Sequence, residues 1–187
     1  MSHNPHPCNH HNCVCEVVRK IVCAQKEVSD RDKNKHCSSS CENSIKQLLS
    51  SHSKSKNMNT TIPFVLFNKG SLKPFIASGV HKKEKKGCHH DYDTFAAIET
   101  PVLRAIRFIP HSCCVEVELL QPVNEHCIPV THKGEKLVDF FESKSHHHTV
   151  DFKKTGICIT LDLECFCAIT CLDPIRPLPP GHHSCTC

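Results

Sequence analysis

The stretch that decides the fold is Ile157–Leu172, with the sequence ICITLDLECFCAITCL. Side chains alternate across an extended chain, so every second residue faces the same side. One side would carry Ile157, Ile159, Leu161, Leu163, Cys165, Cys167, Ile169 and Cys171. The other side would carry more polar residues, including Thr160, Asp162 and Glu164. This alternation predicts one long strand of an antiparallel sheet, with a buried face and a wetter face.

Other segments that precede this stretch predict further strands. Cys113–Leu119 alternates in the same way, with valines on one side and glutamates on the other. Residues 61–67 are followed by Asn-Lys-Gly, which indicates a strand that runs into a turn and returns at residues 74–77. Two prolines bound a further strand at 102–109, and residues 137–141 fit either a strand or a short helix. The sheet therefore starts after residue 60.

The N-terminal part has a helical period instead. Val14, Val17, Val18 and Ile21 are spaced by three and four residues, which predicts a helix over 13–29. A second short helix is expected from residue 41 or 42 to 49. The fold class is thus α+β, with a short N-terminal helical segment followed by an antiparallel sandwich- or barrel-like sheet. The expected divisions are a disordered His-rich arm (1–12), the helical segment and linker (13–56), a β-rich assembly domain (57–172) and an exposed Pro/His/Cys-rich tail (173–187).

Charge and hydropathy restrict the partners. The net charge is +4, and the densest basic run, Lys82–Lys86, lacks interleaved aromatic residues and is interpreted as a solvated loop. We therefore expect no nucleic-acid partner. No apolar run approaches the roughly 20 residues of a membrane span, and no secretion signal is visible. We expect synthesis in a cytosol and no membrane partner.

Sulfur and imidazole dominate the remaining chemistry, with 16 cysteines and 17 histidines among 187 residues. In a cytosolic product such cysteines fit bound metal, redox chemistry, or oxidation after the cell lyses. Neighbours such as Cys165 and Cys167 lie about 7 Å apart along a strand, at the upper limit for a disulfide. Their partners must lie on other strands or on other molecules, unless they remain buried thiols.

Position along the chain separates two groups of cysteines. Those on or beside the flexible ends are candidates for intermolecular disulfides: Cys8, Cys13, Cys15, Cys185 and Cys187. Those within the expected elements are candidates for intrachain or lattice disulfides: Cys23, Cys37, Cys41, Cys113, Cys114, Cys158, Cys165, Cys167 and Cys171.

Two other functions compete with a cross-linked structural protein. Cys37 and Cys41 have an acceptable zinc-ligand spacing, and His10, His11, Cys13 and Cys15 form a dense donor cluster, but the chain has no second well-spaced pair. A zinc-binding protein is therefore the alternative. A cysteine-dependent enzyme is more remote, because the sequence has no nucleophile elbow, phosphate-binding glycine loop, HExxH or CxxC motif. We assign no catalytic residue, metal ligand or cofactor.

Several of these motifs resemble one known family. The stretch Cys158–Leu172 is similar to the C-terminal signature of the spore coat protein Y/Z family, which comprises outer coat, crust and exosporium proteins. The Cys-Val-Cys of residues 13–15, the pair Cys37 and Cys41, and residues 62–67 resemble the start, the cysteine pair and the first strand of that family. The lysine- and histidine-rich segments 81–93 and 133–154 and the tail depart from its pattern.

The resemblance implies a morphogenetic protein of the bacterial spore surface that is not an enzyme. It implies self-assembly into a two-dimensional lattice, expected to be hexameric, that disulfides reinforce. The implied partners are further copies of this chain and other spore coat or crust proteins. A protein made in the mother cell would meet oxidising conditions at the spore surface, so its thiols could end as cross-links.

Overall fold

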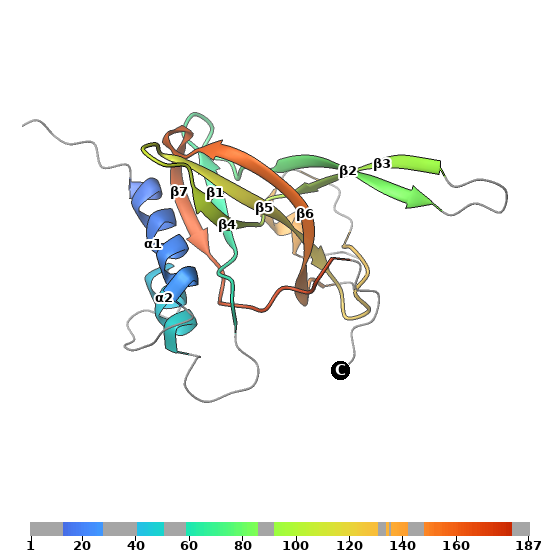
Figure 1. Cartoon of the computed structure of the whole chain (residues 1–187), viewed down its shortest axis with the longest axis horizontal. Helices are drawn as coiled ribbons and strands as arrows, with labels where there is room; N and C mark the ends of the chain where they lie inside the picture. Colours follow the sequence, from blue (N-terminus) through green and yellow to red (C-terminus); the bar gives the residue numbers. More distant parts are fainter. Residues whose placement is uncertain are drawn as a thin grey trace, which may run out of the picture.

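A computed structural model describes residues 13–27, 41–50, 59–85, 92–130, 134, 136–141 and 148–180. Within these residues two helices precede seven strands and two short 3-10 turns, which confirms the α+β class and the N-terminal position of the helices. The sheet is not closed into a barrel. Figure 1 shows the two helices beside one end of the strands and a long two-stranded arm that projects from the other end.

Five strands form the central sheet in the order β6-β5-β4-β1-β7. In chain order they are β1 (Phe64–Asn68), β4 (Leu103–Phe108), β5 (Cys114–Val123), β6 (Asp151–Asp162) and β7 (Phe166–Cys171). Every pairing is antiparallel. The alternation predicted for Cys113–Leu119 is confirmed, since Val115, Val117 and Leu119 are fully buried.

Residues 157–172 belong to two strands, so their prediction as one long strand is wrong. The 3-10 turn η3 (Leu163–Cys165) separates β6 from β7. The Asp162 side chain accepts a hydrogen bond from the Glu164 N–H (2.9 Å) and caps the turn, while Leu163 is fully buried. β6 and β7 are the two edges of the sheet, yet this short turn joins them. The sheet therefore curls until its edges approach each other at this end.

The helices cover one half of the inner sheet face. Helix α1 (Cys13–Glu27) packs against β4, β7 and η3, and α2 (Cys41–Ser50) packs against α1 and β7. Val18 and Ile21 of α1 and Leu48 of α2 are fully buried, as their helical spacing predicted. Gln25 fixes the register of α1: its Nε2 donates to the Ala105 carbonyl (3.0 Å), and its Oε1 accepts from the Ile62 N–H (2.9 Å).

The other half of this face lies under the base of the arm formed by β2 (Ala77–Lys85) and β3 (Tyr92–Thr100), hereafter the β2–β3 arm. Gly79 allows this contact, because a Cβ there would lie 2.5 Å from Ile157 Cγ2 and 3.1 Å from Leu119 Cδ2. Lys82–Lys85 belong to β2, so the interpretation of the basic run as a loop is wrong for these residues.

A smaller apolar cluster lies on the opposite sheet face. Val65, Val102, Leu120 and Phe152 form its buried part, and the 3-10 turn η2 (Leu137–Phe140) and residues 172–175 pack around it. The segment after β7 was expected to be exposed. Its described part is instead hydrogen-bonded to the body, through the N–H groups of Ile175 and Leu178, and Pro174 and Pro177 are buried. None of the described helices has the length and apolar character needed to cross a membrane.

Candidate cross-linking site

A disulfide joins α1 to the sheet near the turn between β4 and β5. Cys15 pairs with Cys113 with their Cα atoms 6.0 Å apart, although 98 residues separate them in the chain. Cys15 is buried at 4% exposure. The Arg19 guanidinium lies over the Phe108 ring at 4.8 Å, and its Nη2 is 3.7 Å from Cys15 Sγ. This bond therefore belongs to the packed interface between helix and sheet.

A second disulfide joins the first residue of α2 to the last residue of β7. The Cα atoms of Cys41 and Cys171 are 4.8 Å apart across a separation of 130 residues. Cys127, which is buried at 6% exposure, is also disulfide-bonded. Cysteine pairing thus ties the helices to both the middle and the edge of the sheet.

Five described cysteines are free, and three of them lie at the end of the sheet where its edges approach each other. Cys165 is in η3, Cys167 is in β7, and Cys114 pairs in register with Asp162, the residue before η3. Cys165 and Cys167 are exposed. The Leu163 N–H donates to the Cys113 carbonyl (3.2 Å), which holds the turn beside the Cys15–Cys113 disulfide. We name Cys114, Cys165 and Cys167 the cysteine-rich end; it lies where the tip of β6 meets the start of β7 in Figure 1.

Cys167 lies at an irregularity in the strand pairing. Ala168 pairs with Phe67 and Phe166 pairs with Asn68, so Cys167 is the extra residue of a bulge. Its Sγ is 3.6 Å from the carbonyl oxygens of both Phe67 and Asn68, and the side chain is exposed. A bulge bends a strand and redirects the side chain of its extra residue. The expectation that Cys165 and Cys167 share one strand face with buried residues is therefore wrong.

The other two free thiols lie apart from this end. Cys23 is exposed on α1, and Cys158 is exposed on the outer face of β6, where it pairs in register with Glu118. Partial burial of the Cys158 thiol raises its pKa, and the carboxylates of Glu118 and Glu116 raise it further against an opposing effect of Arg104. A thiolate is the reactive form of cysteine, so Cys158 is a poorer nucleophile than an unperturbed thiol.

Two charged pairs join β4 to β5 near Cys158. Arg104 Nε is 2.6 Å from Glu118 Oε2, and Arg107 Nε is 2.5 Å from Glu116 Oε2. The Glu118 carboxylate is buried and also accepts from the Gly156 N–H (2.9 Å). These pairs connect β4 to β5 and leave the carboxylates with partners.

The structure locates the predicted site cysteines as follows. Cys15 was grouped with the intermolecular candidates and lies instead in an intrachain disulfide. The reason is that Cys15 belongs to α1 and is buried there, so it is not on an exposed chain end. Cys13 is the first residue of α1, and its side chain lies outside the described part, as do Cys8, Cys37, Cys185 and Cys187. Cys41, Cys113 and Cys171 form intrachain bonds. The bonded Cys127 was not among the predicted site cysteines, and no local sequence pattern around it indicates its pairing.

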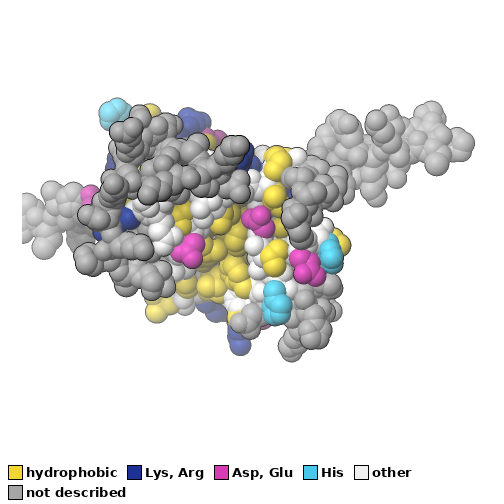
Figure 2. All heavy atoms as spheres, turned by 90° about the horizontal axis from the view of Figure 1, so that it is seen from below, with side chains coloured by type: hydrophobic (Ala, Val, Ile, Leu, Met, Phe, Trp, Pro, Cys, Tyr) yellow, Lys and Arg dark blue, Asp and Glu magenta, His cyan; other side chains and the backbone are white. Residues whose placement is uncertain are grey.

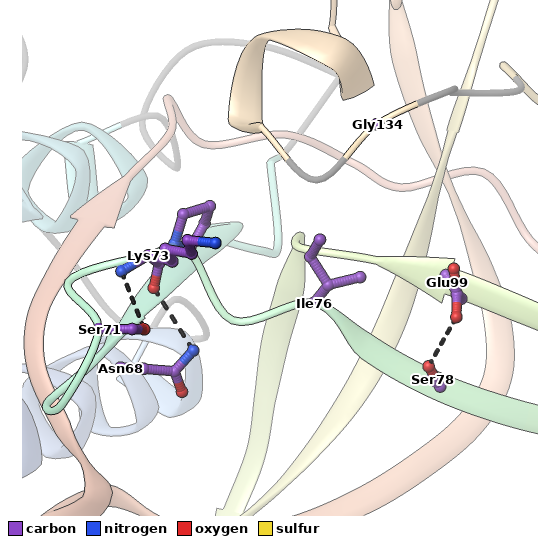
Figure 3. A pocket seen from close by; sticks show the side chains of 8 residues that line it. Asn68, Ser71, Lys73, Ile76, Ser78, Glu99 and Gly134 are labelled. Carbon is purple, nitrogen blue, oxygen red and sulfur yellow. Dashed lines mark hydrogen bonds between the residues drawn. The ribbon is translucent and has the colours of Figure 1, made fainter.

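The described surface also carries pockets and apolar residues. A cavity of about 310 Å³ lies between the β1–β2 turn and the base of the arm. Its polar groups pair with each other, as Asn68 with the Lys73 carbonyl and Ser78 with Glu99 (Figure 3). Six large apolar side chains are exposed: Leu72, Val80, Phe95, Ile128, Val138 and Val150. On the face shown in Figure 2, apolar side chains gather at the centre with acidic and histidine side chains nearby.

Within the described residues, no three His, Cys, Asp or Glu side chains are grouped so that they could hold a metal ion. Intrachain disulfides that join the helices to the sheet, together with exposed free thiols at one end, are the properties expected of a protein that is cross-linked into a larger structure. A family model described as Spore coat protein Z matches residues 1–174. The chain belongs to the spore coat protein Z family.

This membership confirms the family resemblance seen in the sequence, and it supports a structural role in the spore coat. Spore coat protein Z of Bacillus subtilis (strain 168) is 30% identical to this chain over 172 residues, which cover 92% of the chain and 95% of that protein. No solved structure matches the chain significantly.

Proposed function

We propose that this spore coat family member is a non-enzymatic building block of the outer spore surface, in the crust or exosporium, and that it assembles into a disulfide-reinforced two-dimensional lattice. The observation that carries the proposal is the division of the cysteines into two sets. The buried Cys15 and the half-buried Cys41, Cys113 and Cys171 are bonded within the chain, whereas Cys165 and Cys167 are free and exposed. The first set stabilises each copy, and the second set links copies.

The cross-linking step needs two thiols from neighbouring copies and an oxidant. Each new disulfide forms one S–S bond and releases two protons and two electrons, which dissolved oxygen or an oxidised small disulfide accepts. Cys165 and Cys167 are exposed and therefore accessible to a second molecule. We also propose as linkers the cysteines near the two ends of the sequence, Cys8, Cys13, Cys185 and Cys187.

Non-covalent contacts would arrange the copies before oxidation. Exposed apolar side chains such as Val80 and Phe95 supply surface for such lateral contacts, because burying them on association is favourable. A lattice needs contacts that repeat in two directions, and covalent links then slow dissociation. The stability of the spore surface would then depend on the slow rate at which copies dissociate as well as on the equilibrium of assembly. Further copies of this chain, in hexamers, and other coat or crust proteins are the proposed partners.

Size-exclusion chromatography and negative-stain microscopy of the purified chain, with and without strong reductant, test this function. We expect large ordered assemblies that reductant weakens. Peptide mapping after blocking of free thiols should identify inter-copy bonds at Cys165 or Cys167, and the double variant Cys165→Ser/Cys167→Ser should show fewer covalent oligomers than the matched control Cys158→Ser. A monomer under both conditions would overturn the proposal. Stoichiometric zinc whose removal unfolds the monomer would favour the metal-binding alternative instead.

A further inference from the structure

The β2–β3 arm carries two large apolar side chains that are exposed, Val80 and Phe95. We propose that the arms of neighbouring copies pair edge to edge, with β3 of one copy hydrogen-bonded to β2 of the next. This inference rests on the proposed self-assembly and specifies its contact. Each edge of the arm thus binds a second copy of this chain.

The first argument is the hydrogen bonding of the arm. Its two strands pair in register from Ala77 and Thr100 to Lys85 and Tyr92, and no other strand of the described residues pairs with them. Each strand therefore has a hydrogen-bonded neighbour on one side. Two-stranded hairpins are marginally stable in water, and exposed edges pair readily with further strands. The body supports the base of the arm, where Gly79 packs on Ile157.

The second argument is the outward face of the arm. Exposure alternates over residues 77–81 and 94–100, and Val80, Phe95 and Ala97 lie on the exposed side. Val80 is 63% exposed and Phe95 is 76% exposed. Val80 pairs with Ala97, which makes Phe95 its diagonal neighbour on the same face, within reach of an aromatic ring. Adding a strand on either edge covers the flanks of these apolar residues.

Charge selects which edges meet. Strand β2 contains three lysines and one glutamate, a net charge of +2, whereas β3 contains Asp93 and Glu99, a net charge of −2. Pairing β2 with β2 would bring lysine-rich strands together, and like charges across strands are destabilising. Pairing β3 with β2 of the next copy joins opposite charges and continues the antiparallel order. Because this contact uses two different edges, it can be repeated from copy to copy, as a ring or an extended array requires.

Charge exchange between two variants tests the choice of edges. Lys82→Glu/Lys83→Glu gives a copy with two acidic strands, and Asp93→Lys/Glu99→Lys gives a copy with two basic strands. We expect each variant alone to associate about tenfold more weakly than the original chain, since several like-charged pairs add. An equimolar mixture should associate again. Sedimentation velocity on protein whose free thiols are blocked with iodoacetamide excludes new cross-links from this readout.

A matched control separates the arm from general surface effects. Val80→Lys places a charge on the outward face of the arm and should weaken association. Leu72→Lys changes a side chain of similar exposure (72%) in the β1–β2 turn and should not. Circular dichroism of each variant shows whether the body has folded.

Hydrogen exchange of the unaltered chain keeps the proposal testable if an altered arm loses its structure. Assembled protein should show amides of residues 80–85 and 92–97 that exchange at least about tenfold more slowly than in dilute monomer. Three outcomes would overturn arm pairing and leave the proposed function intact. The assemblies could form without slower exchange of these amides, or each charge variant could assemble normally on its own. The mixed variants could also fail to associate while the arm amides of the unaltered chain stay unprotected. A chain that stays monomeric at every concentration would overturn both.

Discussion

Cys41 and Cys171 bond the start of α2 to the end of β7, with Cα atoms 4.8 Å apart across 130 residues of chain. β7 is an edge strand, with β1 as its only hydrogen-bonded neighbour among the described strands. The disulfide therefore holds a helix against an edge that would otherwise be less firmly attached. A cross-link over so long a loop strongly restricts the unfolded chain.

Removing this bond should weaken the fold of the single copy. For the double variant Cys41→Ala/Cys171→Ala, we expect the free energy of unfolding to fall by about 2–4 kcal/mol, because the unfolded chain regains conformational freedom. Guanidinium denaturation without reductant measures the change. The free and exposed Cys158, replaced by alanine, serves as the control and should shift the free energy by less than about 0.5 kcal/mol. Equal effects of the two variants would argue against a structural bond between Cys41 and Cys171.

Gln25 should contribute to stability through its two hydrogen bonds to the sheet. Gln25→Ala leaves the Ile62 N–H and the Ala105 carbonyl without this partner, so we expect a loss of about 1–3 kcal/mol. Gln25→Glu keeps an acceptor for Ile62 but removes the donor to Ala105. Thermal unfolding should place it between the original chain and Gln25→Ala. Gln47→Ala, a half-buried change on α2, is the control, and a loss as large as that of Gln25→Ala would contradict the assignment.

Gly79 should be required for the arm to pack on the sheet. In Gly79→Ala the new methyl group would meet Ile157 Cγ2 at 2.5 Å, so either the arm or the isoleucine must shift. We expect destabilisation of about 1–3 kcal/mol, as for other overpacked sites. Gly70→Ala, with no atom within 4 Å of its Cβ, should have little effect in the same denaturation series. Unchanged stability of Gly79→Ala would show that the base of the arm lies elsewhere.

The Cys158 thiol should react slowly for an exposed cysteine. Its raised pKa means a smaller thiolate fraction at neutral pH, so alkylation by iodoacetamide should lag behind that of Cys165. Replacing Glu116 by glutamine removes one carboxylate that raises the pKa and should speed the reaction. Mass spectrometry of timed samples from pH 7 to 9 gives both rates. Equal rates at the two cysteines, or no response to Glu116→Gln, would contradict this account.

The same pKa shift has a consequence for stability. The folded chain retains the Cys158 proton to a higher pH than the unfolded chain does. The unfolded state is therefore favoured as the pH rises from the ordinary thiol pKa to the raised one. The free energy of unfolding should fall across this alkaline window, and Cys158→Ser should remove that part of the decrease.

The sequence by itself determined the element types wherever a local period was strong. The three- and four-residue spacing of Val14, Val18 and Ile21 predicted α1, because a helix presents such residues on one face. Alternation predicted β5 for the corresponding reason. The cysteine-rich signature also indicated the family, which the match over residues 1–174 confirms.

Tertiary structure decided what period alone could not. The sequence of residues 157–172 alternates without a break, yet η3 separates two strands there, where Asp162 caps the turn and Leu163 is buried. The sequence therefore gave no sign that β6 and β7 lie at opposite edges of the sheet. Disulfide partners were equally hidden, because pairing depends on Cα atoms that approach within about 7 Å, and only the fold brings Cys15 to Cys113. Local chemistry determines which residues can bond, and long-range packing determines which of them meet.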